Sequence, residues 1–302
     1  MTEVIASGHA PHLFCFGLGY TARALAARLM AEGWAVSGTC RDEETRMALA
    51  DMGIRAFLFD RERPLDDPAG ILSRATDILS SIPPDADGDP VLDCHGESIA
   101  AMSGLRWIGY LSTTGVYGDT GGARVNETSP VNPSSARSQR RVRAENRWLD
   151  LYWNGRLPVH LFRLAGIYGP GRSALDQVRA GRARRIDRPG HLFSRIHVDD
   201  IVNVLRTSMA RPRPGAVYNV CDDLPAAPGD VVAYACELLG VKPPPVVAYD
   251  EAAGDMSAMA LSFWNDNRTV DNSRIKRELE IKLAYPDYKA GLKAVHDSES
   301  MG

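Results

Sequence analysis

The sequence predicts an α/β fold, in which a doubly wound parallel sheet is covered by helices on both faces and is followed by a smaller α+β lobe. Short apolar runs alternate with helical patterns through the first 220 residues. The runs are nearly continuous in apolar residues, as is typical of parallel strands that are buried on both faces. A glycine-rich turn joins the first of these runs to the first helical pattern.

Seven segments have the length and composition of strands, and helical patterns follow most of them. The expected strands are His12–Gly17, Ala35–Cys40, Arg55–Asp60, Thr76–Ser81, Trp107–Ser112, Val159–Leu164 and Val217–Val220. The expected helices are Ala22–Glu32, Glu43–Met52, Arg137–Trp153 and Asp199–Met209. After Asp222 prolines punctuate shorter helices, which indicates a smaller lobe. In a doubly wound sheet ligands bind beyond the carboxyl ends of the strands.

Composition narrows the class of protein. The 302 residues are 44% hydrophobic and 24% charged, which is ordinary for a globular protein and excludes a disordered or fibrous one. No run of eighteen apolar residues is present, so we expect no membrane span, and we see no secretion signal. Five scattered cysteines in no metal-ligand spacing indicate free thiols in a reducing cytoplasm, and we expect no metal site.

The charge is distributed unevenly along the chain. The net charge is −3, but the segment from Pro133 to Arg195 holds fourteen arginines and four acidic residues. This basic segment predicts either an anionic ligand or arginine-rich helix surfaces. A nucleic-acid partner is disfavoured, because no helix-turn-helix, zinc or base-stacking motif accompanies the arginines.

The glycine-rich turn reads Gly17-Leu18-Gly19-Tyr20-Thr21-Ala22, which is the pattern G-x-G-x-x-A between a strand and a helix. Gly17 permits the tight turn, Gly19 lets the backbone approach a pyrophosphate, and Ala22 lets the helix pack closely on the strand. The free N–H groups at the start of the helix favour phosphate. The turn, including Tyr20 and Thr21, is therefore a candidate site for a dinucleotide.

The end of the second expected strand bears on which dinucleotide binds. NAD-binding proteins usually place an acid there to hold the ribose 2′-OH, whereas this chain has Arg41. An arginine can pair with a 2′-phosphate, so we expect NADP, with NAD as the alternative, because Asp42 and Glu43 follow directly. Asp60, which ends the third expected strand, is either an adenine ligand or a plain turn residue.

With these residues in place, the chain resembles the NAD(P)-dependent epimerase/dehydratase proteins, the extended and atypical branches of the short-chain dehydrogenase/reductase superfamily. Five segments carry the resemblance: the glycine turn, Tyr110–Gly118, Arg163–Gly171, Arg195–Asp200 and Tyr218–Val220. The resemblance implies a Rossmann domain that binds NAD(P) and a smaller lobe that closes over a substrate, often a nucleotide sugar. We expect residues 1–172 and 196–222 to form the first, and residues 173–195 and 223–302 to form the second.

The resemblance also implies roles at matching positions. Thr113 falls where the family keeps a serine or threonine that bonds the reacting oxygen, although it could instead cap the turn at Gly115. Ser112 beside it is a candidate cofactor residue, as is Tyr168, whose loop matches a segment near the nicotinamide. Arg195 resembles the family arginine that meets substrate phosphate.

The family's defining motif, Tyr-x-x-x-Lys, is broken in this chain. Counting back from Glu145 places Arg141 at the lysine and Arg137 at the tyrosine, and every lysine lies beyond residue 241. Arginine can replace the ribose contacts of the lysine, but it stays charged and cannot supply the proton of a tyrosine. Two arginines can stabilise an oxyanion. Tyr117 is the best nearby phenol to supply the proton. The alternative is that Tyr117 merely packs against its loop.

The leading hypothesis is an atypical NADP-dependent oxidoreductase or epimerase/dehydratase-like enzyme with a small anionic substrate. Arg137, Arg141, Arg172 and Arg195 would meet the negative charge, helped by arginines between residues 179 and 188. The alternative is a non-catalytic dinucleotide-binding redox sensor or regulatory protein. The resemblance implies a homodimer, for which the Arg137–Trp153 helix, with Trp148 and Tyr152, could supply the surface.

Overall fold

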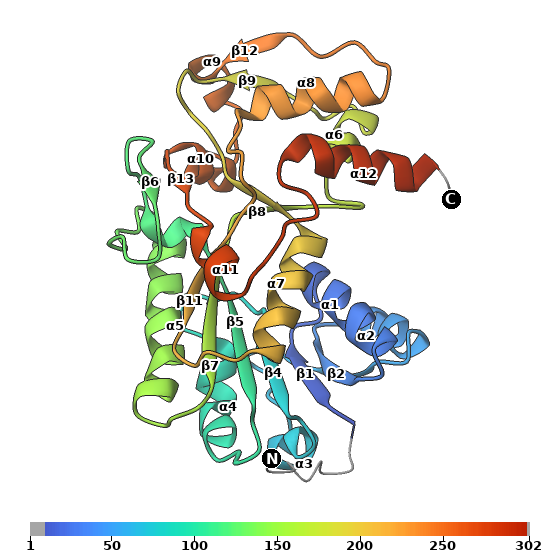
Figure 1. Cartoon of the computed structure of the whole chain (residues 1–302), viewed down its shortest axis with the longest axis vertical. Coiled ribbons are helices and arrows are strands. Elements are labelled where there is room, and N and C mark those ends of the chain that lie inside the picture. Colours follow the sequence, from blue (N-terminus) through green and yellow to red (C-terminus); the bar gives the residue numbers. More distant parts are fainter. Residues whose placement is uncertain (1–9, 301–302) are drawn as a thin grey trace.

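The computed structural model describes residues 10–300, except for the side chains of residues 258 and 259. Its centre is a seven-stranded sheet in which every neighbouring pair of strands is parallel (Figure 1). The strands are β1 (His12–Phe16), β2 (Ala35–Cys40), β3 (Arg55–Leu58), β4 (Asp77–Ser80), β5 (Trp107–Thr113), β7 (Val159–Leu164) and β11 (Val217–Val220). They lie in the order β11-β7-β5-β4-β1-β2-β3. The direction of winding therefore reverses between β1 and β4, where an α/β sheet opens a crevice for ligands.

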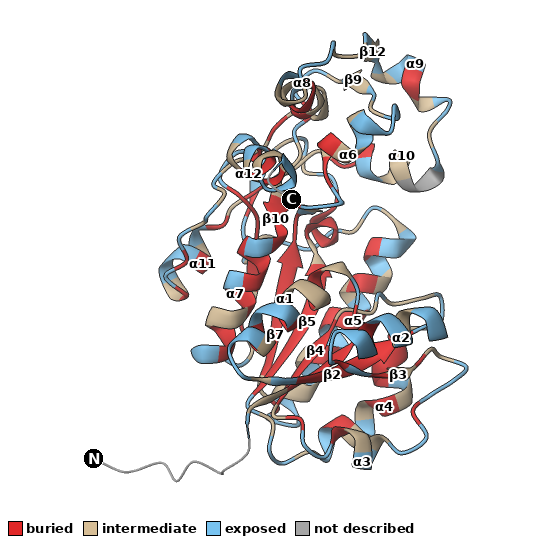
Figure 2. Cartoon of the chain, turned by 90° about the vertical axis from the view of Figure 1, so that its right-hand side faces the viewer, coloured by how far each residue is buried: buried red, intermediate tan, exposed pale blue. Residues whose placement is uncertain are grey.

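Helices cover both faces of this sheet, and successive strand residues point to opposite faces. One face packs against α1 (Tyr20–Ala31), α2 (Glu43–Asp51) and α7 (Val198–Ala210), and the other against α3 (Pro68–Leu72), α4 (Pro90–Ala100) and α5 (Ala136–Trp153). In β1, Leu13 and Cys15 belong to the first core, while Phe14 and Phe16 belong to the second. Figure 2 shows the strands as the most continuously buried part of the chain. This two-sided burial is why most positions of the strands are apolar, and why the polar residues that they do contain, such as His160 and Arg163 in β7, are buried.

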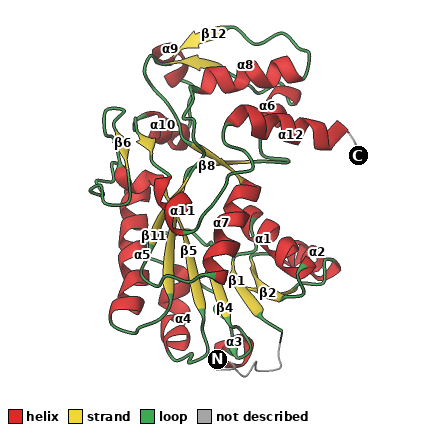
Figure 3. Cartoon of the chain, viewed as in Figure 1, coloured by secondary structure: helices red, strands yellow, loops and turns green. Residues whose placement is uncertain are grey.

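The remaining elements lie beyond the carboxyl edge of the sheet, chiefly in the upper part of Figures 1 and 3. The helices are α6 (Ala174–Arg179), α8 (Pro228–Leu238), α9 (Tyr249–Ala253), α10 (Ala258–Trp264), α11 (Ser273–Glu278) and α12 (Tyr288–Ser300), with the 3₁₀ turn η1 (Thr114–Tyr117). Three parallel pairs of short strands join them: β8 (Gly166–Tyr168) with β10 (Arg195–His197), β9 (Arg185–Asp187) with β12 (Val246–Ala248), and β6 (Arg124–Val125) with β13 (Thr269–Val270). A third core joins α6, α8 and α12. The predicted fold class, including the α+β character of this smaller part, is confirmed.

All seven expected strands are present, and their ends agree to within two residues. The expected helices are also present, but α1 begins at Tyr20, inside the glycine motif, and not at Ala22. The helix α4, which follows β4, was not expected from the sequence. Its start carried a signal, since Asp89 caps the helix and Pro90 occupies its first position. Gly96 in its middle weakens the helical pattern.

The expectation that Trp148 forms part of an exposed surface on α5 is wrong. Its side chain is fully buried, its ring stacks on Tyr110 with centroids 5.6 Å apart, and its Nε1 donates to Asp89 at 2.9 Å. Trp153, at the last residue of the helix, is instead 69% exposed. The helix turns Trp148 towards the sheet because residues three and four apart share a face, as Ala144 and Glu145, also buried, show.

Two further features bear on the class of protein. Among the described residues, no helix is long and apolar enough to cross a membrane. Within residues 10–300, no three histidine, cysteine or acidic side chains are grouped so that they could hold a metal ion. All five cysteines are free thiols.

Candidate functional site

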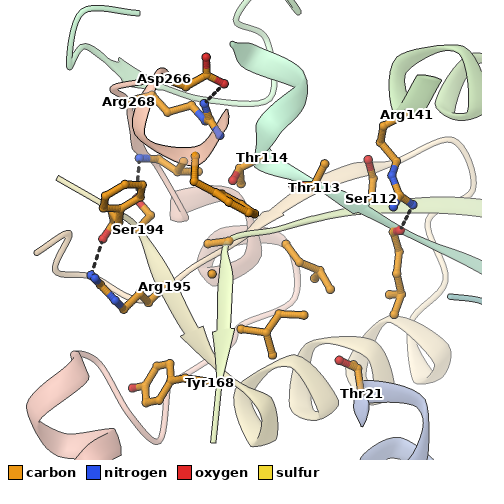
Figure 4. Close-up of a pocket in the computed structure, with 18 of the residues that line it drawn as sticks. Thr21, Ser112, Thr113, Thr114, Arg141, Tyr168, Ser194, Arg195, Asp266 and Arg268 are labelled. Atoms are coloured by element: carbon orange, nitrogen blue, oxygen red, sulfur yellow. Dashed lines mark hydrogen bonds and ion pairs between the residues drawn. The ribbon is translucent and has the colours of Figure 1, made fainter. Parts of the chain in front are cut away.

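A cavity of about 550 Å³ opens at the carboxyl ends of β1, β4, β5 and β7, at the crevice that the strand order predicts. The smaller part of the chain closes its other side, so that Arg141 and Arg195 reach the cavity from opposite sides (Figure 4). Most of the predicted site residues line it: Gly19, Tyr20, Thr21, Ser112, Thr113, Arg137, Arg141, Tyr168, Arg172 and Arg195.

The glycine turn forms the entrance to the cavity at the start of α1. Gly17 adopts φ +86°, and its N–H donates to Thr39 Oγ1 at 2.8 Å, while its carbonyl accepts from Ser81 Oγ at 2.5 Å. A side chain at Gly17 would meet Ile82 at 2.8 Å. Gly19 is different: it caps α1 without a side-chain acceptor, and a Cβ there would have no atom within 4 Å. The turn is thus rigid at Gly17 and open at Gly19.

The next residues of the motif connect the turn to distant parts of the chain. Tyr20 donates its hydroxyl hydrogen to the carbonyl of Pro170 at 3.0 Å, and the guanidinium of Arg172 lies 5.6 Å from the centre of its ring. Thr21 is buried and lines the cavity, whereas Ala22 is fully buried in the core beneath the helix. Arg172 therefore stands close to the end of the cavity where α1 begins.

Arg41 and Asp60 lie at the carboxyl ends of β2 and β3, outside the residues that line the cavity. Arg41 is exposed, and its guanidinium forms no ion pair within residues 10–300. Asp60 instead caps a turn: its Oδ1 accepts from the N–H groups of Glu62 and Arg63 at 3.1 and 2.9 Å, and its Oδ2 accepts from Arg63 Nη2 at 3.0 Å. Of the two readings of Asp60, the geometry favours the turn residue.

At the end of β5 the two hydroxyls are already engaged. Ser112 donates to Glu145 Oε1 at 2.5 Å, and Glu145 also accepts two guanidinium nitrogens of Arg163, the shorter contact being 2.8 Å. Thr113 Oγ1 accepts from the N–H of Gly115 at 3.1 Å, so it does cap the turn while it lines the cavity. Glu145, which was used in the sequence only to align the motif, is therefore a buried acid that holds Ser112 and Arg163 in place.

The structure does not bring Tyr117 into the cavity. Its side chain is 1% exposed, its hydroxyl donates to Asn219 Oδ1 at 2.8 Å, and it accepts from Arg163 Nη1 at 2.9 Å. Burial raises the pKa of this phenol, although Arg163 opposes the shift. In this conformation Tyr117 is a structural member of the Glu145–Arg163 network, and it cannot reach a ligand in the cavity.

Arg137 and Arg141 stand on consecutive turns of α5 and both line the cavity. Arg141 is buried, and its Nη1 donates to the hydroxyl of Tyr110 at 3.0 Å and to the carbonyl of Leu111 at 2.9 Å. Arg137 is exposed at the mouth, where its guanidinium lies 5.9 Å from the centre of the Phe263 ring. Two permanent cations thus occupy one wall of the cavity.

The opposite wall carries Tyr168 and Arg195 from the paired strands β8 and β10. Tyr168 donates to the carbonyl of Asp287 at 3.3 Å, and burial raises its pKa. Arg195 Nη1 donates to the carbonyls of Phe193 and Ala226, each at 2.9 Å. Both side chains are therefore held in fixed orientations by backbone acceptors.

Several lining residues were missed in the sequence, because they come from the loop around α10 and β13. Arg268 donates from Nη1 to Asp266 Oδ2 and to the carbonyl of Gly118, both at 2.9 Å, while Asp266 Oδ1 accepts from Ser134 Oγ at 2.5 Å. Phe263 and Ser194 complete this side. No motif marks them, since the fold alone brings residues 263–270 against residues 118–134.

The expectation that arginines between residues 179 and 188 help at the rim is wrong. Arg179 pairs with Glu299, Arg184 lies 3.9 Å from Asp255, and Arg188 donates to the carbonyl of Trp264. None of them lines the cavity. They lie on or near α6 and β9. These two elements pack against α8, α12 and β12, so the three arginines bind acceptors within the smaller part of the chain.

The described lining can bind anions more readily than it can move protons. Five arginines line the cavity, and Asp266, which is paired with Arg268, is the one carboxylate among the described lining residues. The two lining phenols, Tyr20 and Tyr168, both donate to backbone carbonyls. No tyrosine–lysine pair is among these residues.

Behind Arg195 lies a buried carboxylate with a testable effect on stability. Both carboxylate oxygens of Asp222 are buried without a hydrogen-bond partner within residues 10–300. Burial raises the pKa of this carboxyl group to about 8. The charge of Arg195 opposes the rise, whereas Asp223 and Asp287 add to it. The folded protein keeps this proton while the unfolded chain loses it near pH 3.8. Stability is therefore expected to fall as the pH rises from about 4 to about 8, at up to about 1.4 kcal/mol per pH unit.

Asp222→Asn is expected to flatten this dependence. Urea unfolding of the wild type and the variant between pH 5 and pH 8 measures the difference, with the exposed Asp230→Asn as the matched control. Equal slopes for the wild type and Asp222→Asn would show that the carboxylate is ionised in the folded state at neutral pH.

Comparison with known proteins gives curated relatives from two strains of Escherichia coli and a group of solved structures. No family model matches the chain. Protein YeeZ of Escherichia coli K12 is 30% identical over 285 residues, which cover 90% of this chain and 95% of that protein. A solved protein of unknown function from Silicibacter pomeroyi is 48% identical, with a TM-score of 0.87 over 96% of this chain and 99% of that one.

The fold also matches that of an NAD-dependent sugar-nucleotide enzyme. UDP-glucuronic acid 4-epimerase from Bacillus cereus, solved with UDP-glucuronic acid and NAD, superposes with a TM-score of 0.77 over 96% of this chain and 99% of its own. The two sequences are 15% identical, so this likeness concerns the fold alone.

Proposed function

The chain belongs to the same family as the Escherichia coli protein YeeZ, and from this premise we propose that it binds NADP(H), with NAD(H) as the alternative. The proposed activity is that of an oxidoreductase or epimerase/dehydratase-like enzyme of the atypical short-chain dehydrogenase/reductase type. Its substrate is a small anionic molecule, such as a nucleotide sugar.

One observation carries the proposal: a single cavity runs from the open start of α1 to a wall of arginines. Gly19 leaves room for a phosphate against the backbone, and the unpaired N–H groups of the helix favour its charge. The switch point between β1 and β4 is where this fold binds dinucleotides, and the matching fold of the Bacillus cereus epimerase, solved with NAD, adds support. A bound nicotinamide would supply hydride transfer.

In this proposal the protein's own residues bind and orient, and do not donate a proton as a phenol would. Arg172 stands at the glycine-turn end and Arg195 on the far wall, so both are placed to meet negative charge. Arg141 occupies the place of the motif lysine and Arg137 that of the tyrosine. Both guanidiniums stabilise an oxyanion electrostatically.

A second candidate is a non-catalytic dinucleotide-binding redox sensor or regulatory protein. The observation that favours it is the lack of a tyrosine–lysine pair among the described lining residues. The two candidates share the cofactor and differ in turnover.

Two assays separate these candidates. Fluorescence titration with NADPH and NADH tests binding, and no response at millimolar cofactor would defeat both. A screen for NADPH consumption over sugar nucleotides, aldehydes and ketones then tests turnover. Consumption with one of them supports the enzyme, and silence across the screen supports the sensor.

Arg41→Asp tests the cofactor preference. Because the exposed guanidinium of Arg41 is free to pair with a 2′-phosphate, its loss is expected to weaken NADPH binding about 10- to 100-fold and to leave NADH binding nearly unchanged. Parallel titrations measure the ratio, with Arg55→Asp at the amino end of β3 as the control. An unchanged ratio would remove Arg41 from the site.

The other proposals concern the setting of the protein. We retain the division into a cofactor domain (residues 1–172 and 196–222) and a substrate lobe (residues 173–195 and 223–302). We also propose a homodimer in which the exposed Trp153 at the end of α5 contributes to the contact. A cytoplasmic location is consistent with five free thiols.

A further inference from the structure

The guanidiniums of Arg137 and Arg141 form a pair of like charges without a counter-ion. Neither belongs to an ion pair within the described part of the chain: Arg141 donates to two neutral oxygens, and Arg137 contacts only the ring of Phe263. Burial and the proximity of Arg141 together lower the pKa of Arg137. Asp89, which is buried behind Tyr110, senses Arg141 only at longer range. The wall therefore carries positive charge that no acid of the described residues pairs with directly.

Another arginine of the same cavity shows the contrast. Arg268 lies 2.9 Å from Asp266, which is nearly buried with it, so its charge is neutralised within the protein. A charge that faces a cavity with restricted water is costly unless a partner supplies the opposite charge. Arg141 is buried without such a partner, and Arg137 stands one helical turn away at the exposed mouth, so an anionic ligand between them would supply the opposite charge. Planar guanidiniums recognise carboxylate and phosphate groups with directed, paired hydrogen bonds.

The side chains around Arg137 and Arg141 indicate the chemical character of the rest of the ligand. Phe263, whose ring lies beside Arg137, is 51% exposed, and Leu192, which lines the same cavity with Phe193, is 36% exposed. Large apolar side chains that remain open to a cavity gain free energy when a ligand covers them. An anionic group at the arginines and an apolar or planar body against Phe263 would satisfy both demands.

We propose that Arg137 and Arg141 form a subsite for the carboxylate or phosphate of an organic anion whose apolar or planar body lies against Phe263 and Leu192. The subsite takes the place in which the related enzymes keep their proton donor, so this end of the cavity binds negative charge. The inference deepens the proposed function and rests on it, because the same cavity would hold the dinucleotide.

Four small probes test the subsite by ligand-observed NMR titration of the full chain, with and without NADPH. Benzoate and phenyl phosphate carry an anionic group on a planar body, benzamide is the neutral counterpart, and inorganic phosphate has no body. Both aryl anions, or one of them, are expected to bind at least tenfold more tightly than benzamide, and the tighter of the two identifies carboxylate or phosphate as the preferred group. Added salt should weaken them.

Two variants locate the binding. Arg137→Gln is expected to weaken the aryl anions at least tenfold, while Arg143→Gln, an exposed arginine of the same helix outside the cavity, leaves them unchanged. Phe263→Ala should weaken the aryl anions and spare inorganic phosphate. NADPH affinity should stay within about threefold in Arg143→Gln, which lies outside the cavity.

The outcomes divide clearly. Equal affinity of the wild type and Arg137→Gln for the aryl anions, binding of benzamide as tight as that of benzoate, or no binding of either aryl anion would each overturn the subsite. Binding of benzoate without any binding of NADPH or NADH would leave the subsite standing and defeat the proposed cofactor instead. The two proposals thus fail in different assays.

Discussion

Gly19→Val is expected to weaken the binding of NADPH about 100-fold, a loss of about 2.8 kcal/mol, while leaving the fold intact. A Cβ at Gly19 meets no protein atom within 4 Å, and the residue has φ −83° and ψ −166°, which a side chain permits. The valine methyl groups would instead fill the space where the backbone is expected to approach the pyrophosphate. Fluorescence titration measures the affinity. The midpoint temperature of thermal unfolding is expected to drop by no more than about 4 °C.

Gly17→Ala is the informative companion. Its φ of +86° and the 2.8 Å approach of Ile82 strain any side chain there, so this variant is expected to lose stability as well as affinity. The pair separates damage to the turn from obstruction of the site. If Gly19→Val bound NADPH as tightly as the wild type does, the phosphates would have to lie away from α1, and the proposed cofactor site would be wrong.

Glu145→Ala is expected to destabilise the protein by about 3–5 kcal/mol. The Glu145 and Arg163 side chains are 3% and 8% exposed and meet at 2.8 Å, so removing the acid leaves a buried cation without its partner. Ser112 loses its acceptor at the same time, and Tyr117 remains bonded to an uncompensated arginine. Urea unfolding at neutral pH measures the loss of free energy.

Two comparisons sharpen this experiment. Glu97→Ala, at an exposed position of α4, is expected to change the free energy of unfolding by less than about 0.5 kcal/mol. The double variant Glu145→Leu/Arg163→Met is expected to recover much of the loss, because replacing both charges removes the desolvation cost together with the attraction. A loss below about 1 kcal/mol for Glu145→Ala alone would mean that water or another group compensates Arg163.

Much of the fold could be predicted because local patterns repeat along the chain. Apolar runs such as Leu13–Phe16 were placed correctly, since a strand that is buried on both faces is mostly apolar. The glycine turn could be read because the backbone at Gly17 needs a positive φ that few other residues adopt. The helix α4 escaped because its amphipathic pattern is short and interrupted by Gly96.

The site was only partly predictable. Arg137 and Arg141 were expected on one helix, and both line the cavity because four residues make about one helical turn. Asp60 and Tyr117 were expected to contact a ligand, but both bind neighbouring protein groups in the structure. Asp60 accepts from Arg63, and Tyr117 is bonded to Arg163 and Asn219. The type of a side chain determines which bonds it can form, but the fold determines which residue lies within bonding distance of it.

The sequence by itself therefore determined the parallel sheet, the glycine-rich turn between β1 and α1 and the lack of any lysine before Lys242, because each is set by the local sequence. Only the tertiary structure decided that residues 263–270 close the cavity and that Arg179, Arg184 and Arg188 are used elsewhere. It also decided that Glu145 is a buried anchor. These depend on approaches between segments tens to more than a hundred residues apart, whose partners are selected by packing and by the cost of burying a charge alone.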